Sequence, residues 1–158
     1  MTRINRRKFI AGVVTAGAGT CICGLNGCAT FTKTGGAASI PAGAYIVENK
    51  NIKIALDKVS ELGTIGGSVK ITDAKLPQPV IVGRIGVSEY AVVSLKCPHR
   101  GVEVEYKHAD KQFRCASIGH STFAADGTYK KGFAKKSLIK FEAKLDTIDA
   151  NTLIIRFS

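Results

Sequence analysis

Two Cys/His pairs constrain the fold of this chain more than any other feature of its sequence. Cys97 and His99 form one pair, and Cys115 and His120 form the other. The fifteen residues between His99 and Cys115 suit a β-hairpin with its polar turn at residues 108–111. Because such a hairpin brings both pairs onto neighbouring loops, two thiolates and two imidazoles can face each other and hold a metal.

The motif CPHRG at residues 97–101, followed by a spacer of this length and a second Cys/His pair, resembles the Rieske iron–sulfur family. The resemblance covers about the last 115 residues of the chain. It implies a [2Fe-2S] cluster as cofactor, with Cys97 and Cys115 on one iron and His99 and His120 on the other. Imidazole ligands raise the potential of such a cluster, and the implied function is one-electron transfer.

The second pair departs from the family pattern, in which the histidine usually follows the cysteine by three residues. Ile118 stands at that place, and His120 comes two residues later. Either the loop carries an insertion and His120 is the ligand, or the fourth ligand is lost. We favour the insertion, because Gly119 gives the backbone the freedom that a longer loop needs. His108 is an alternative ligand or an exposed polar residue of the hairpin turn.

Further positions bear on the same resemblance. Val102 and Ser117 occupy the places where many Rieske proteins carry a disulfide, which implies a disulfide-free, ferredoxin-like variant. Ser121 or Thr122 is implied as a hydrogen-bond donor to the cluster or to a cysteine sulfur. Residues 132–134, Gly-Phe-Ala, stand where the family has a Gly-Pro-Ala segment that covers the cluster.

From residue 44 onward the chain consists of short β-rich runs that Gly, Pro, Asp and Asn separate. Apolar and polar residues alternate over residues 102–106 and 139–143, which predicts strands with one buried face. Asp126 and Gly127 predict a hairpin turn. No helical period follows the first 30 residues. The sequence therefore predicts an all-β domain over residues 44–158. The resemblance implies a Rieske-type antiparallel β-sandwich with a cluster-binding subdomain of two loops.

Residues 1–30 have the character of a targeting segment, four cations followed by an uncharged apolar run. Arg6 and Arg7 resemble the twin-arginine export signal, a route that suits a protein folded around its cofactor. The run ending at Cys28 resembles a lipoprotein processing box, and an uncleaved membrane helix is the alternative. Either outcome tethers the domain to the periplasmic face of the cytoplasmic membrane, through a linker at residues 31–43 that its small residues make flexible.

The chain carries a net charge of +11, of which the leader supplies four cations and no anion, leaving +7. Around the proposed cluster end and the segment after it lie Lys107, Lys111, Lys130, Lys131, Lys135, Lys136 and Lys140. One interpretation is a docking surface for an acidic redox partner, a cytochrome or a respiratory complex subunit. A solvated basic face that attracts anionic lipids is the other. Nucleic acid is not expected as a partner of an exported chain.

Three classes of function follow from the cysteine and histidine residues. The favoured class is an electron carrier or oxidoreductase subunit, because no Ser/His/Asp set or paired carboxylates predict a substrate-converting site. The same four ligands, Cys97, His99, Cys115 and His120, also suit a Cys2His2 zinc site. The third class is a cluster-less Rieske fold that serves as an interaction module. Arg100, beside His99, is a surface residue that could favour cluster reduction through its charge.

Overall fold

The computed structural model describes residues 36–157, so the predicted leader at residues 1–30 lies outside the described residues. Strands dominate this part of the chain, which confirms the all-β prediction. The strands are β1 (Ala38–Ser39), β2 (Tyr45–Glu48), β3 (Asn51–Ala55), β4 (Ser68–Ile71), β5 (Val80–Arg84), β6 (Tyr90–Ser94), β7 (Val104–Lys107), β8 (Gln112–Cys115), β9 (Thr122–Ala124), β10 (Tyr129–Lys131), β11 (Lys140–Leu145) and β12 (Thr152–Arg156). The helical turns η2 (Leu56–Lys58) and α1 (Ser60–Gly63) are too short to show a period in the sequence.

The larger sheet has the strand order β1-β4-β5-β6-β11-β12-β3-β2, and β11 connects its two halves. Lys140 and Phe141 pair with β6, whereas residues 142–145 pair with β12. Side chains from both halves, including Ile54 of β3 and Val69 of β4, share one hydrophobic core. The sheet therefore folds over on itself at β11 and encloses this first core between its halves.

β5 and β6 are buried on both faces. Val80 and Val82 point into the first core, whereas Ile81 between them points into a second core. In β6, Val92 and Val93 divide in the same way. This explains why the sequence runs apolar here without alternation, as strands covered on both faces do. The second core is the one that contains the two cysteines, Cys97 and Cys115.

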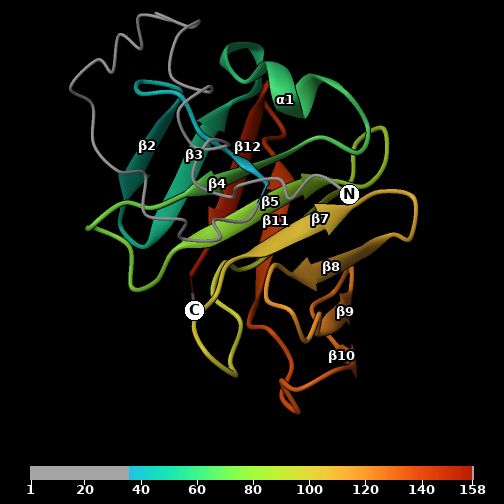
Figure 1. Cartoon of the computed structure of the whole chain (residues 1–158). Coiled ribbons are helices and arrows are strands. Elements are labelled where there is room, and N and C mark those ends of the chain that lie inside the picture. The colour runs from blue at the N-terminus through green and yellow to red at the C-terminus, as the bar shows by residue number, and fades with distance from the viewer. Residues whose placement is uncertain (1–35, 158) are drawn as a thin grey trace, which may run out of the picture. The chain divides into compact units, whose positions relative to one another are not determined.

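The smaller sheet, of order β10-β9-β8-β7, covers the second core (yellow to orange in Figure 1). Its β7–β8 hairpin matches the predicted one, with Lys107 opposite Gln112 and a turn closed by the Lys111 amide on the His108 carbonyl. The sheet packs closely on β5, because a Cβ placed on Gly83 would lie 3.1 Å from the ring of Tyr106. The hairpin thereby delivers Cys115 next to the loop that follows β6.

The segment predicted as a linker, residues 31–43, is described from residue 36 onward. Within it, Ala38–Ser39 pair in parallel with β4 as strand β1, and Ala37 is buried. Small side chains let this segment lie close against the sheet, so strand pairing begins before residue 44. Within residues 36–157 no helix is long and apolar enough to cross a bilayer.

Candidate metal centre

The first site loop, residues 97–101, is closed by its own backbone. The Cys97 amide donates to the Val102 carbonyl and the Gly101 amide donates to the Cys97 carbonyl, both at 2.8 Å. Gly101 has φ of +67°, a left-handed conformation that glycine adopts without steric cost. The tight turn holds both ligand candidates together, with 2.9 Å between Cys97 Sγ and His99 Nδ1.

The second site loop, residues 115–121, is tied at its ends by a 2.8 Å hydrogen bond from the Cys115 amide to the Ser121 carbonyl. It is also fixed to the strand that leaves the first loop, because the Ala116 amide donates to the Glu103 carbonyl at 3.0 Å. These two bonds set the position of Cys115 relative to Cys97 before any metal enters.

Three of the four predicted ligands meet at one point. Cys97, His99 and Cys115 each offer a donor atom, and these atoms all lie within 4.8 Å of one another. Both cysteines are free thiols, and both are buried. The Ser117 hydroxyl lies beside them, 3.3 Å from Cys115 Sγ and 3.4 Å from His99 Nε2. Two sulfurs and an imidazole nitrogen are the donors that zinc and iron–sulfur clusters prefer, so the chemistry of the group fits the implied cofactor.

His120 lies outside this group of three. Its amide donates to the Ser117 carbonyl, its backbone has the left-handed φ of 38°, and Nδ1 lies 3.4 Å from the Cys115 carbonyl oxygen. The side chain is exposed at the edge of the second loop. The structure thus keeps His120 next to the site without joining it to the other donors, and its role as the fourth ligand stays a prediction.

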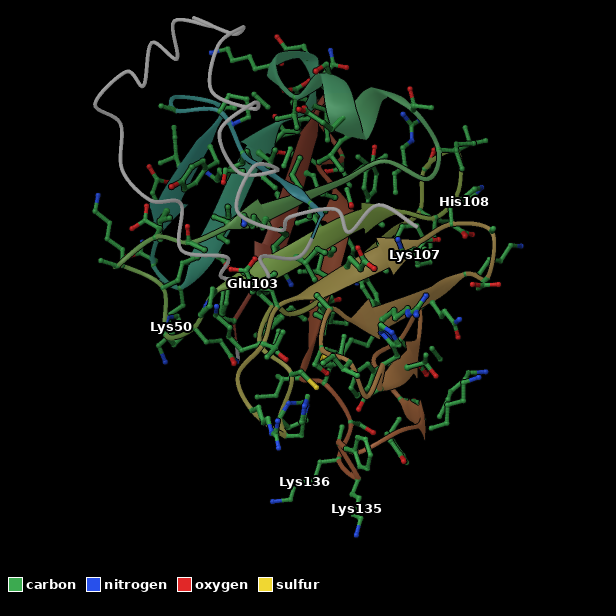
Figure 2. The ribbon with its side chains drawn as sticks, in the orientation of Figure 1. Lys50, Glu103, Lys107, His108, Lys135 and Lys136 are labelled. Carbon is green, nitrogen blue, oxygen red and sulfur yellow. The ribbon has the colours of Figure 1, made fainter. Side chains whose placement is uncertain are left out.

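His108 is not near the donor group. It stands at the turn of the β7–β8 hairpin, whereas Cys115 lies at the far end of β8, a strand of four residues that is about 10 Å long. Its ring packs on Gly66, where an added Cβ would come within 2.7 Å of Cγ. The contact anchors the hairpin turn on the larger sheet, which is a structural role for this histidine (labelled in Figure 2).

The segment after β10 covers the second loop from the side, as its place in the sequence implies. The Ala134 amide donates to Ser121 Oγ at 3.0 Å. Phe133 lies against Gly119, where an added Cβ would be 2.1 Å from the ring, so a larger residue at this position would displace Phe133. Phe133 therefore supplies an apolar cover where the family has proline.

Burial of the Cys97 thiol disfavours its ionisation in the metal-free protein. Burial raises the pKa of the Cys97 thiol to about 11. Its backbone contact with His99 and its hydrogen bond with the Ser121 hydroxyl oppose this shift, and the neighbouring Cys115 adds to it. A bound metal must therefore displace a proton from Cys97. Of the two predicted hydroxyl donors, Ser121 contacts the sulfur, whereas Thr122 Oγ1 is buried without a partner in the described part of the chain.

Comparison with known proteins gives a match in structure. No family model matches the sequence, and no curated protein matches it. The crystal structure of the cyanobacterial plasma membrane Rieske protein PetC3 from Synechocystis PCC 6803 is 27% identical to this chain, with a TM-score of 0.50. The match covers 63% of this chain and 94% of that one. The described residues therefore have a Rieske-type fold.

The Rieske-type domain carries its donor group on the two loops that the sequence motifs single out. Cys97, His99 and Cys115 are brought together as their spacing predicts. The contacts of Ser117 were not predicted from the sequence, which marks it only as the place of an absent disulfide cysteine. Its position two residues after Cys115 is the signal that could have indicated a contact with the sulfur.

Proposed function

We propose that this protein carries one electron at a time through a Rieske-type [2Fe-2S] cluster. The observation that supports it best is the convergence of two buried thiols and an imidazole from two loops of a Rieske-type domain. Cys97 and Cys115 would bind one iron, and His99 and His120 would bind the other. The cluster supplies a one-electron redox couple, and its imidazole ligands raise the potential.

The residues of the chain prepare the site for that cofactor. The backbone bonds of the two loops fix the sulfur positions, and the second core excludes water from behind the cysteines. Exclusion of water limits the solvent reorganisation that accompanies electron transfer and protects iron–sulfur bonds from hydrolysis. His99 is half-buried and His120 exposed, so the electron would leave by the histidine side of the cluster.

The decisive experiment measures iron and acid-labile sulfide in the full-length protein after anaerobic reconstitution. Absorption and electron paramagnetic resonance spectra of the reduced protein then identify the cluster type. His120→Ala is expected to lose most of the cluster, because the second iron would keep one protein ligand instead of two. His108→Ala serves as the matched control and should retain the cluster. If His120→Ala and His108→Ala bind equal iron, His120 is not a ligand.

A zinc site is the second candidate, because three donor atoms within 4.8 Å are enough to bind one zinc ion with a fourth position filled by His120 or water. The same preparation distinguishes the two. A colourless protein with one zinc per chain and no resonance signal after reduction would identify zinc. Protein that binds neither metal after reconstitution would instead support the cluster-less interaction module.

We further propose that the leader exports the folded protein and tethers it at the periplasmic side of the cytoplasmic membrane, where it serves a respiratory oxidoreductase. The support is the Arg6-Arg7 pair and Cys28 in the sequence, together with the plasma membrane assignment of the cyanobacterial relative. Replacement of both arginines by lysine should stop export. Cys28→Ala should release the domain from membranes if Cys28 is lipidated, and should leave it bound if the apolar run is a membrane helix.

A further inference from the structure

Five exposed cations lie in the first site loop or in the segment of residues 130–136, which runs beside the second site loop. Arg100 follows His99 in the first loop, Lys131 pairs with Thr122 next to the second loop, and Lys135 follows Ala134, whose amide bonds to Ser121. Lys130 and Lys136 extend the same segment, and Figure 2 shows Lys135 and Lys136 projecting outward. Residues 111–125 and 127–141 contain no acidic residue at all. We call Arg100, Lys130, Lys131, Lys135 and Lys136 the cationic face.

Several lysines elsewhere in the described chain are paired with carboxylates. Ion pairs join Lys53 to Glu48, Lys107 to Glu105, and both Lys70 and Lys96 to Glu103. Within residues 36–157 no ion pair involves a member of the cationic face, judged by the same distance between nitrogen and carboxylate oxygen. The positive charge at the metal centre is therefore left uncompensated by the chain itself, and it is available to a partner.

Two large apolar side chains are exposed among these cations. Ile118, in the second loop, is 86% exposed, and Phe133 is 70% exposed. They come from adjacent segments, since the Phe133 ring lies against Gly119, the neighbour of Ile118. An apolar centre with a charged rim is the usual composition of a protein–protein interface.

We propose that the cationic face, with Ile118 and Phe133 at its centre, is the docking surface for an acidic one-electron redox protein. This inference rests on the proposed electron-transfer function and names its partner. A cluster held by the site would supply one electron to the oxidised cofactor of the partner, and no atom would be transferred. An anionic bilayer would match the charge but offers no one-electron acceptor, so we commit to a protein. Attraction between opposite charges raises the rate of encounter, and the two apolar side chains close the contact.

The test measures association of the full-length protein with a soluble acidic c-type cytochrome, at about 0.01 M salt where charges act over about 30 Å. Lys135→Glu/Lys136→Glu is expected to lower the association rate constant by about tenfold or more, and the difference should shrink at high salt. The matched control is Lys50→Glu/Lys58→Glu, which makes the same change in net charge on exposed residues of the β2–β3 turn and of η2. It should leave the rate constant almost unchanged. Ile118→Ser should speed dissociation without altering the salt dependence.

The experiment separates this proposal from the electron-transfer function. Binding is measured on both metal-free and reconstituted protein, because the cations are present in each, whereas cluster formation is read from the absorption spectrum. Equal effects of the two double variants would overturn the proposal. So would equal binding of a basic cytochrome c of the same fold. A wild-type protein that binds phosphatidylglycerol vesicles but not the acidic cytochrome would overturn it in favour of a lipid surface.

Discussion

The Ser121 hydroxyl joins three parts of the site. It accepts a 3.0 Å hydrogen bond from the Ala134 amide and interacts with the Cys97 sulfur, and its side chain is fully buried. A hydrogen bond donated to sulfur favours the more negative, reduced form of a cluster. Ser121→Ala should therefore lower the midpoint potential, measured by voltammetry of the reconstituted protein. Thr122→Val is the control, because the Thr122 hydroxyl has no partner in the described residues and its loss should leave the potential unchanged.

The Cys97 thiol should lose its proton at a higher pH than an ordinary cysteine in the metal-free protein. Its pKa of about 11 stands above the ordinary value of 9.0 because burial disfavours the thiolate. A folded-state pKa above the unfolded one means that the stability this thiol contributes is present below pH 9 and is lost as the pH rises toward 11. Anaerobic titration of thiolate absorbance, compared with Cys97→Ser, should show this late step. A midpoint near 9 would mean that the site is open to water.

The sequence predicted four ligand candidates as neighbours, and the structure brings three of them together. Cys97 and His99 are two residues apart, so their convergence follows from one tight turn. Cys115 follows from the length of a regular hairpin. His120 depends on the path of an irregular loop with a left-handed residue, and no periodic pattern determines such a path. The Ser117 contacts depend on the same loop and were missed for the same reason.

At the scale of elements, Glu103, the residue before β7, fixes both site loops to the larger sheet. The backbone of Glu103 bridges Lys96 on one side and accepts from the Ala116 amide on the other. Its side chain, 11% exposed, pairs with Lys70 of β4 at 3.0 Å and with Lys96 at 3.3 Å. Burial alone would raise the pKa of this carboxyl, but the two lysines lower it below its ordinary value of 4.5.

Glu103→Gln should destabilise the domain by on the order of 3 kcal/mol, because it leaves the largely buried Lys70 ammonium facing a neutral amide. Since the folded-state pKa is lowered, this stabilisation is present above pH 4.5 and is lost as the pH falls below it. Urea unfolding at neutral pH and at acid pH measures both effects. Glu105→Gln, whose pair with Lys107 is more exposed, should cost about 1 kcal/mol or less. Equal losses for Glu103→Gln and Glu105→Gln would contradict the anchoring role.

Alternation of polar and apolar residues predicted the strands that have one wet face, such as β7 and β11. It could not show that β5 separates two cores. Residues 80–82 are all apolar, so the sequence does not indicate that alternate side chains enter different cores. The two-residue strand β1 and the one-turn helix α1 were missed, because both are too short to show a repeating pattern of apolar residues. Their positions are set by pairing and packing with distant residues rather than by local sequence.

At the scale of the whole domain, one hydrophobic core supports the scaffold and the other surrounds the cysteines of the site. The first core lies within the folded larger sheet and contains no ligand candidate. The second core includes Cys97 and Cys115 and is covered by the smaller sheet. β5 and β6 contribute side chains to both cores and lie between them. We expect the stability of the two cores to depend on the cofactor to different degrees. Loss of the metal removes bonds only from the second core.

Removal of the cofactor should therefore loosen the smaller sheet and leave the larger one intact. Hydrogen exchange of loaded and metal-free protein should show faster exchange for the amides of β7–β9 and of the two site loops. The amides of β3 and β12, which pair with each other over five residues and bury Ile52, Ile54, Leu153 and Ile155 in the first core, should keep their protection. Far-ultraviolet circular dichroism should retain its β-sheet signal. Ligand binding stabilises only the parts of a protein whose unfolding breaks the bonds to the ligand. Equal acceleration of amide exchange in β3 and β7 would therefore mean that the two cores unfold as one unit. In that case the metal stabilises the whole domain and not the site alone.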